Sequence, residues 1–439
     1  MHYVVEPSAL ASGVVTVPGD KSISHRALIL GGIAKGRTNI SGFLPGEDCL
    51  ATLAALKAMG VRIERPGDTR IIMEGCGADG LRAPSGPLDM GNSGTAMRLF
   101  AGLLSGQSFS SKLIGDASLS QRPMSRIIEP LTLMGAQIDS SAGKPPLLIS
   151  GERSLSGIAY QLPVASAQVK SAILLAGLFA DGEITVIEPA TTRDHTERML
   201  RTMGVDIRSG ETQIVMPGGQ SLTGADVSVP ADLSSAAFII LATLLATDCE
   251  VTLVGVGVNP TRTGVIDILR EMGAAISLDN VRLFGEEPVA DIVVHSAELH
   301  GIEVDPARVS LAIDEFPLLF IAAAMAVGET TFSGIGELRV KESDRIATMA
   351  AGLRVLGIEV DETPDGAVVH GGVISGGSVK SGGDHRIAMS FAVAATRAGW
   401  PVRIEDTAAV DTSFPGFVQC LQSLGIGINS FDDDIGVSA

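Results

Sequence analysis

Basic residues are scarce in this sequence of 439 residues, which has 32 Lys and Arg against 50 Asp and Glu and a formal charge of −18. So acidic a chain is not attracted nonspecifically to nucleic acid or to anionic membranes. We therefore expect neither of them as a partner. Any place where Lys and Arg do gather is a candidate binding site for an anion.

Cysteine is rarer still. The chain has four, Cys49, Cys76, Cys249 and Cys420, which are far apart and form no C-x-x-C pair. This spacing predicts neither a zinc site nor a disulfide framework, and we expect all four to be buried thiols. The seven histidines form no metal-binding motif, so no metal ion and no other cofactor is expected.

Long apolar runs are also missing. Hydrophobic residues make up 45% of the chain and aromatic residues 4%, so the cores must pack through Ala, Val, Ile, Leu and Met. The longest apolar stretches, such as residues 236–246, are shorter than the ~20 residues that cross a bilayer. Residues 1–20 lack the basic start and apolar run of a signal peptide. We expect a soluble, cytoplasmic protein with two large domains or three ordinary ones.

One short phrase occurs six times along the chain. In each copy Met or Leu is followed by Gly and then by an alternating apolar segment, a pattern typical of a helix that ends at a C′ glycine before a strand. The copies are residues 57–61, 132–136, 201–205, 270–274, 354–358 and 422–426.

A second phrase, also present six times, alternates with the first. It has a polar or Gly-rich start, an apolar helix, a Gly turn and a strand, and its starts are residues 21–24, 92–95, 165–168, 233–235, 313–315 and 383–386. The helices are apolar nearly all round, as in residues 172–180, which predicts burial beneath sheets. Residues 17–22 are echoed by 229–234, so we expect two domains of three repeats each.

The helix starts are candidate anion sites, because the first turn of a helix exposes unpaired N–H groups and a partial positive charge. Several of these starts carry polar or charged residues. They are Lys21, Ser22 and Arg26 at the first, Gly94 and Thr95 at the second, Ser166 and Gln168 at the third, Asp314 at the fifth, and Asp384 and Arg386 at the sixth.

Two further basic motifs lie outside the helix starts. In residues 339–345, helical spacing would place Lys341 and Arg345 on one face, where like charges repel. A shared anion would explain them, as would the neighbouring Glu342 and Asp344. In residues 121–124 the proline predicts an extended conformation for Arg122. Residues 19–22 look like part of a P-loop but lack its G-x-x-x-x-G-K-[ST] spacing, so a nucleotide site is not predicted.

Six of these segments together resemble the 5-enolpyruvylshikimate-3-phosphate synthase family. They are residues 18–26, 91–98, 121–124, 166–171, 339–345 and 384–386. The resemblance implies an α/β fold, a two-domain inside-out α/β barrel with three βαβαββ units per domain. It also implies a domain of residues 19–230, a second of residues 1–18 and 231–439, and an active site in the cleft between them.

The resemblance implies the site residues as well. Lys21, Asp314 and Glu342 would be catalytic. Shikimate 3-phosphate would be bound by Lys21, Ser22, Arg26, Ser166, Ala167, Gln168, Arg193, Asp314 and Lys341. Phosphoenolpyruvate would be bound by Lys21, Gly94, Arg122, Gln168, Arg345 and Arg386. The implied reaction transfers the enolpyruvyl group to the acceptor and releases phosphate, with no metal, no cofactor and a monomeric chain.

Some positions depart from the family pattern. Ala167 stands where many relatives have a second Ser, and Thr412 stands where the family has a phosphoenolpyruvate-binding Lys. The sensitivity to glyphosate, a phosphoenolpyruvate mimic, is therefore not predicted.

Two other functions fit the sequence less well. The UDP-N-acetylglucosamine enolpyruvyl transferases have a similar fold but a reactive Cys on a loop that here, at residues 115–120, contains none. A sliding clamp would spread Lys and Arg along helices that face DNA, whereas here they gather at helix starts.

Overall fold

The computed structural model describes residues 1–151 and 154–432. Contacts between residues divide the chain into two compact units. Unit 2 consists of Gly19–Pro230 and the short stretch Leu283–Glu287, and unit 1 consists of Met1–Pro18, Ala231–Arg282 and the chain from Pro288 onward. The domain bounds that the resemblance implies would place residues 283–287 in the other unit. They form the turn of a long hairpin, and its packing against residues far away in the sequence could not be read from the repeat.

Unit 2 contains three sheets of four strands, with the same order in each. The first two strands are parallel and the other two are added antiparallel. The sheets are β14-β3-β5-β4 (Asp226–Ser228, Lys35–Ser41, Arg70–Cys76, Arg62–Gly67), β6-β7-β9-β8 (Leu88–Asp89, Ser111–Ile114, Lys144–Ile149, Ile138–Ser141) and β10-β11-β13-β12 (Ala159–Gln161, Glu183–Ile187, Gln213–Pro217, Arg208–Ser209).

Unit 1 repeats this plan. Its sheets are β2-β15-β17-β16 (Gly13–Val15, Glu250–Gly257, Glu287–His295, Ala275–Phe284), β18-β20-β19 (Glu329–Phe332, Gly366–His370, Val360–Thr363) and β21-β22-β1-β23 (Gly377–Lys380, Val402–Glu405, His2–Val5, Ile428–Phe431). The three-stranded sheet has a parallel bridge between Glu303 and Thr331 where a fourth strand would pair. The N-terminal strand β1 is a central strand of the last sheet.

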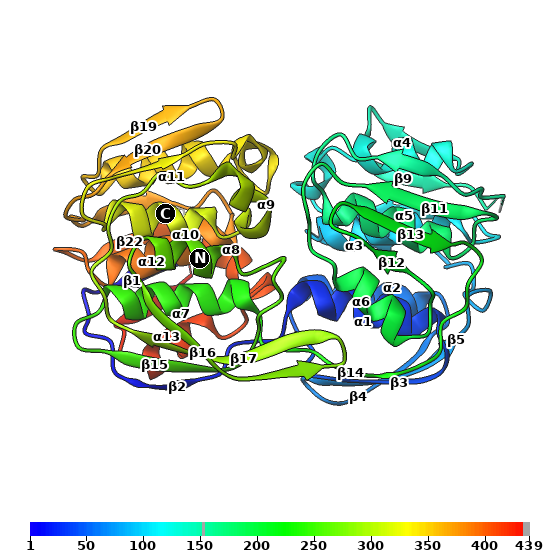
Figure 1. Ribbon diagram of the computed structural model, residues 1–439, viewed down its shortest axis with the longest axis horizontal. Helices are drawn as coiled ribbons and strands as arrows, with labels where there is room; N and C mark the ends of the chain where they lie inside the picture. Colours follow the sequence, from blue (N-terminus) through cyan, green and yellow to red (C-terminus); the bar gives the residue numbers. More distant parts are fainter. Residues whose placement is uncertain (152–153, 433–439) are drawn as a thin grey trace, which may run out of the picture. The chain divides into compact units, whose positions relative to one another are not determined.

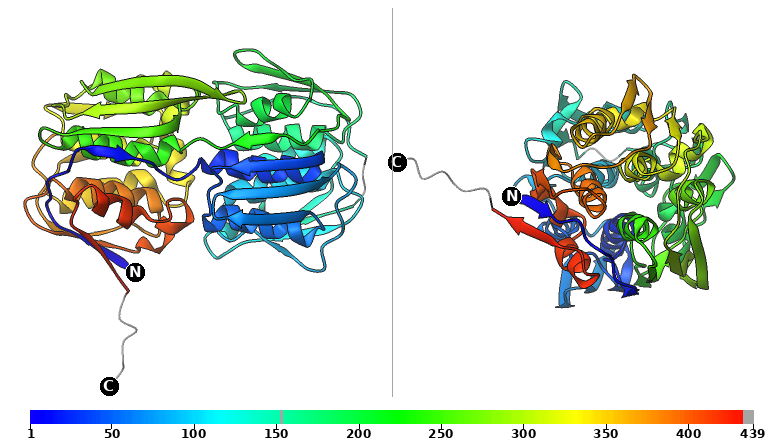
Figure 2. Two further views of the ribbon diagram at one scale, coloured as in Figure 1. Left: turned by 90° about the horizontal axis from the view of Figure 1, so that it is seen from below. Right: turned by 90° about the vertical axis from the view of Figure 1, so that its left-hand side faces the viewer.

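Apart from the four-residue α9 (Val309–Ala312), the α-helices of the described residues fall into two classes. Within each unit three apolar helices lie inside and the sheets lie outside (Figures 1 and 2). The inner helices are α1 (Lys21–Ile33), α3 (Gly94–Ser105) and α5 (Ala167–Gly177) in unit 2, and α7 (Leu233–Leu245), α10 (Phe316–Ala324) and α12 (His385–Ala395) in unit 1. Every residue from 171 to 180 is buried, as the apolar pattern predicted.

The other class contains α2 (Glu47–Ala58), α4 (Ser125–Leu133), α6 (His195–Thr202), α8 (Gly264–Glu271), α11 (Arg345–Val355) and α13 (Phe417–Ser423). Each is followed by the predicted C′ glycine, and the φ angles of these six glycines lie between +86° and +109°. Only glycine adopts such angles readily. Together with the strand order, this confirms the predicted α/β fold with three βαβαββ units per domain.

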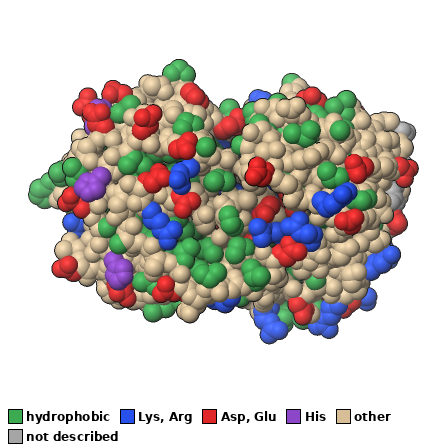
Figure 3. Space-filling view, viewed as in Figure 1, with side chains coloured by type: hydrophobic (Ala, Val, Ile, Leu, Met, Phe, Trp, Pro, Cys, Tyr) green, Lys and Arg blue, Asp and Glu red, His purple; other side chains and the backbone are tan. Residues whose placement is uncertain are grey.

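Each unit has its own hydrophobic core. One cluster of buried side chains is drawn from residues 23–229 and the other from residues 3–17 and 231–428. On the face seen in Figure 3, Lys and Arg side chains lie beside Asp and Glu within both units. No helix in the described part of the chain is long and apolar enough to cross a membrane.

Two details differ from the sequence-based expectation. All four cysteines are free thiols, but only Cys49 and Cys249 are buried and Cys76 and Cys420 are partly exposed. Lys341 and Arg345 do not share a helix, because the 3₁₀ helix Gly336–Val340 ends before Lys341 and α11 begins at Arg345. The residues between them are not helical, and the Asp344 side chain caps the start of α11.

Candidate active site

The inner helices of unit 2 begin at side-chain caps. Asp20 accepts a hydrogen bond from the Ile23 N–H at 2.8 Å, and Ser93 and Ser166 cap α3 and α5 in the same way. Asp and Ser are favoured as caps because they satisfy an otherwise unpaired N–H group. The predicted residues that follow each cap therefore lie in the first helical turn, where the N–H groups and the helix dipole favour an anion. These residues are Lys21, Ser22, Gly94, Ala167 and Gln168.

Three predicted phosphoenolpyruvate contacts, Gly94, Arg122 and Gln168, come together around Arg98. The Arg98 guanidinium donates to the Gln168 side-chain oxygen at 2.6 Å and to the Gly94 carbonyl at 3.3 Å. A Cβ atom on Gly94 would lie 2.8 Å from Arg98 Nη1 and 3.3 Å from Arg122 Nη1. Glycine is thus required for two guanidinium groups to approach this helix start. Arg98 lies within the segment 91–98 that resembles the family, but it was not predicted as a site residue.

Arg122 has the predicted extended backbone, with φ −76° and ψ 139°. Its guanidinium donates to the Asn92 side chain at 2.6 Å. The proline after Arg122 excludes helical geometry at this point, so the guanidinium is held beside the start of α3.

Lys21 and Arg26, both on α1, differ in accessibility. The Lys21 side chain is 23% exposed and forms an ion pair with Asp48. Arg26 is buried, and donates to Thr196 at 2.6 Å and Ser171 at 2.8 Å. Burial lowers the pKa of Arg26 to about 10, so it stays charged at neutral pH. Arg26 thereby links α1 to α5 and α6, and its contact with substrate stays a prediction.

Arg193 lies in the loop that joins β11 to α6 and is half-buried. The loop lies beside the first turn of α5, because the Lys170 ammonium group donates to the Thr192 carbonyl at 3.4 Å. Ser166 caps this helix. The nine predicted residues of unit 2 lie on three inner helices, at a cap of one of them or in two loops: Lys21, Ser22, Arg26, Gly94, Arg122, Ser166, Ala167, Gln168 and Arg193.

Unit 1 holds the other five predicted residues, centred on Asp314. Lys341 Nζ and Arg345 Nη1 each lie 3.5 Å from Asp314 Oδ1. Lys341 and Arg345 therefore converge on the Asp314 carboxylate, and they do so from an interrupted segment and not from one face of a continuous helix. A bound anion shared by the two cations stays a prediction.

Arg345 is the most deeply buried cation of this set, with a side chain that is 1% exposed. It contacts Asp384 at 2.8 Å and Glu342 at 2.6 Å. Burial alone would lower its pKa, but the carboxylates of Asp384, Glu342 and Asp314 outweigh burial and raise the pKa of Arg345. The group is permanently charged, and Glu342 is held beside it.

Arg386 is positioned from three sides. Its guanidinium donates to the Asp314 carbonyl at 3.0 Å, to Glu315 at 3.3 Å and to Ser234 at 3.3 Å. The buried Arg262 also donates to Ser234, at 2.6 Å. Sequence reasoning missed Glu315 and Arg262. The only signal for Glu315 was its place beside Asp314, and none singled out Arg262.

Thr412 lies at the end of a 3₁₀ helix (Thr407–Thr412), where its hydroxyl donates to the Ala409 carbonyl at 2.6 Å. A threonine cannot replace the charge of a lysine. The structure therefore offers no ammonium group at this position.

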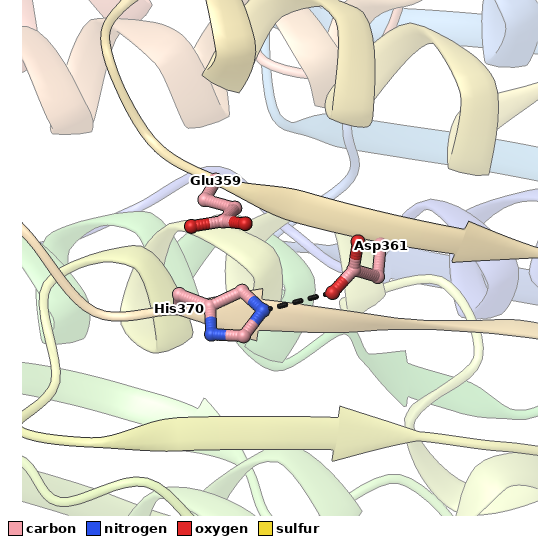
Figure 4. Close-up of side chains that lie close together, drawn as sticks. All are labelled: Glu359, Asp361 and His370. Carbon is pink, nitrogen blue, oxygen red and sulfur yellow. Dashed lines mark hydrogen bonds and ion pairs between the residues drawn. The ribbon is translucent and has the colours of Figure 1, made fainter.

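One group of possible metal ligands occurs among the described residues. Glu359, Asp361 and His370 have ligand atoms within 4.8 Å of one another (Figure 4). Asp361 lies on the edge strand β19, Glu359 just before it and His370 at the end of the central strand β20. His370 already pairs with Asp361 at 3.0 Å and Glu329 at 3.1 Å. The hydrogen bond to Asp361 raises the pKa of His370. Ion pairing accounts for this exposed group, and we assign it no role in the reaction.

Comparisons with known proteins indicate the same family as the motifs in the sequence. A family model described as EPSP synthase (3-phosphoshikimate 1-carboxyvinyltransferase) matches residues 5–421. A protein named 3-phosphoshikimate 1-carboxyvinyltransferase from Alkalilimnicola ehrlichii is 56% identical over 98% of this chain and 97% of its own length. A protein of the same name from Methylococcus capsulatus is 55% identical over 97% of this chain and 98% of its own.

Solved structures agree. An EPSP synthase from Acinetobacter baumannii matches with a TM-score of 0.87 and 50% identity, covering 98% of this chain and all of the other. The enolpyruvyl transferase NikO from Streptomyces tendae, at 19% identity and a TM-score of 0.79, shares the fold. The match to the family model and the identity to its members over nearly the whole length establish that this chain belongs to the EPSP synthase family.

Proposed function

We infer that this chain is a 3-phosphoshikimate 1-carboxyvinyltransferase. It transfers the enolpyruvyl group of phosphoenolpyruvate to the 5-hydroxyl of shikimate 3-phosphate and releases phosphate, a step in aromatic amino-acid biosynthesis. The observation that carries this inference is the 56% identity to a protein of that name over 98% of the chain. The clustered cations at the helix starts support it, because both substrates are multiply charged anions.

The predicted residues of unit 2 form two groups, which we assign to the two substrates. In unit 2, the first turns of α1 and α5 with Lys21 and Arg193 offer N–H groups and cations for shikimate 3-phosphate. The group around Gly94 and Arg122 offers two guanidinium groups for phosphoenolpyruvate, since planar guanidinium groups match carboxylate and phosphate oxygens. These assignments rest on the family motifs and on the proximity of the side chains.

The chemistry needs an acid and a base. Protonation of the methylene carbon of phosphoenolpyruvate allows the acceptor hydroxyl to attack its neighbouring carbon, which gives a tetrahedral ketal. The carbon–oxygen bond to phosphate then breaks, and a proton leaves the methyl group to restore the double bond. Asp314 and Glu342 are the proposed acid and base, with assistance from Lys21, because carboxylates in fixed positions catalyse such transfers.

The arginines stabilise the charge of the departing phosphate. Arg345 and Arg386 are held by carboxylates at fixed positions, so little reorganisation is needed as negative charge develops. We propose that the residues of units 1 and 2 serve one active site, that no metal or cofactor takes part, and that the enzyme is a cytoplasmic monomer. The family resemblance supports each of these points.

A coupled assay of phosphate release tests the function. The chain with phosphoenolpyruvate and shikimate 3-phosphate, in the presence of EDTA, should release phosphate. Replacing the acceptor by UDP-N-acetylglucosamine should abolish the release. A signal that needs the nucleotide sugar, or none with shikimate 3-phosphate, would contradict the proposal.

The same assay tests the two carboxylates. Asp314→Asn and Glu342→Gln keep the size of each side chain but remove its charge, and each should lower kcat by about 100-fold or more. The binding of shikimate 3-phosphate, measured by calorimetry, should weaken far less. Equal losses in affinity and turnover would assign both residues to structure and not to proton transfer.

A further inference from the structure

Unit 2 contains a buried lysine close to its predicted substrate-binding residues. Lys170 lies on α5 two residues after Gln168, and its side chain is 1% exposed. Its ammonium group lies 2.9 Å from Glu188 and 2.7 Å from Glu197. A lysine is almost never fully buried unless it is paired. The function proposed above gives this lysine no role.

The contacts of Lys170 span the loop that carries Arg193. Glu188 immediately follows β11, and Glu197 lies in the first turn of α6. Lys170 also donates to the Thr192 carbonyl at 3.4 Å, and the Thr192 hydroxyl donates to Glu188. The ammonium group therefore binds both ends of the loop and the backbone of the residue that precedes Arg193.

The next residue on α5 extends the same network. Ser171 accepts a hydrogen bond from Arg26 at 2.8 Å and lies 2.7 Å from the Thr196 hydroxyl. Lys170 and Ser171 together therefore tie α1 and α6 to α5, the helix that Ser166 caps. Burial lowers the pKa of Lys170, but the two carboxylates outweigh burial and raise it, so the ammonium group stays charged.

From this geometry we propose that Lys170 is a positioning residue, which fixes the 188–194 loop so that Arg193 reaches the phosphate of shikimate 3-phosphate at the start of α5. The proposal rests on the function inferred above. Lys170 is too deeply buried to touch the substrate itself, and its effect must pass through Arg193.

A double-mutant cycle tests this route. Lys170→Gln should raise the Kd and KM for shikimate 3-phosphate about tenfold or more, since a small displacement of a binding group is costly. The KM for phosphoenolpyruvate should change less than about twofold. In an Arg193→Ala background, Lys170→Gln should have little further effect on either constant, because residues that act through one another are not additive. Lys170→Arg, which keeps the charge, should restore part of the affinity.

The control is Leu174→Ala, one turn further along α5. Leu174 is fully buried, so the variant also loses stability, but it should keep the affinity for shikimate 3-phosphate. If Lys170→Gln does not fold, the charge-balanced pair Lys170→Gln with Glu197→Gln replaces it in the cycle, with Glu197→Gln as reference.

The outcomes separate the two inferences. If the wild-type enzyme turns over substrate but the effects of the Lys170 and Arg193 variants are additive, the positioning role is wrong and the function stands. The same holds if Lys170→Gln weakens the binding of both substrates equally. A wild-type chain that neither binds shikimate 3-phosphate by calorimetry nor releases phosphate overturns both.

Discussion

At the scale of single residues, the cations of the site are already paired before any substrate arrives. Lys21 pairs with Asp48, and Arg345 contacts the carboxylates of Glu342 and Asp384. A buried cation without a partner would be very costly. In the proposed function, substrate phosphates share these cations with the carboxylates or displace the carboxylates. The paired acids allow basic residues to gather within a chain of net charge −18.

Gly94 gives a prediction at this scale. Gly94→Ala would place a methyl group 2.8 Å from Arg98 Nη1 and 3.3 Å from Arg122 Nη1. Both are ends of flexible side chains, so we expect the fold to survive and the guanidinium groups to move. The KM for phosphoenolpyruvate should rise about tenfold or more, because displaced binding groups lose their alignment. Steady-state kinetics with each substrate varied in turn measures this.

Gly86→Ala is the matched control for that variant. A Cβ on Gly86 meets nothing within 4 Å, so its kinetic constants should equal those of the wild type. An unchanged KM for phosphoenolpyruvate in Gly94→Ala would show that the substrate does not depend on these two arginines.

At the scale of elements, each unit repeats a helix that ends at a glycine and leads into a strand. After each helix of the second class (α2, α4, α6, α8, α11 and α13), the C′ glycine turns the chain towards a strand, and glycine permits this turn because it has no Cβ to clash with the backbone. Gly204 after α6 is a simple case, since its φ is +89° and a Cβ there would meet no atom within 4 Å. Any cost of a side chain at Gly204 is therefore conformational and not steric.

We predict that Gly204→Ala lowers the free energy of unfolding by about 1–2 kcal/mol, the cost of the left-handed conformation for a residue with a Cβ. Urea unfolding followed by circular dichroism measures the change. Gly67→Ala is the control, because Gly67 has equally open surroundings but no positive φ. A midpoint for Gly204→Ala equal to that of Gly67→Ala would contradict the assigned role of the C′ glycines.

The elements also show what the sequence could predict. The six repeats were predictable because each one is a local pattern of cap, apolar helix and glycine. The contact between Lys341 and Asp314 was not predictable, because it depends on the interruption of helical structure before α11, which Asp344 caps. The burial of Arg26 was equally hidden, since its partners Ser171 and Thr196 lie more than 140 residues away.

The Lys170 network was out of reach for the same reason. A lysine among apolar residues on a predicted buried helix could be noticed, but Glu188 and Glu197 become its partners only after β11 and α6 pack beside α5. Long-range pairing of charges follows from the fold and leaves no periodic signal in the sequence.

At the scale of the whole molecule, the two units are unequal in how the chain builds them. All twelve strands of the three unit 2 sheets come from residues 19–230. The ends of this segment lie side by side, because the Asp20 N–H donates to the Pro230 carbonyl at 2.8 Å. Unit 1 instead depends on the first residues of the chain, which supply β2 and the central strand β1.

We therefore predict that residues 19–230, expressed alone, fold and unfold cooperatively, because they contain a complete hydrophobic core and all of their strands. Residues 231–439 alone should not, since without β1 the strands β22 and β23 have no common partner. Thermal unfolding followed by circular dichroism distinguishes the two fragments.

The 19–230 fragment should be inactive, because it lacks Asp314 and Glu342. Adding residues 1–18 as a peptide should promote the folding of the 231–439 fragment only. A cooperative transition for residues 231–439 without the peptide would show that β1 is dispensable, and an unfolded 19–230 fragment would show that unit 2 needs the 283–287 turn.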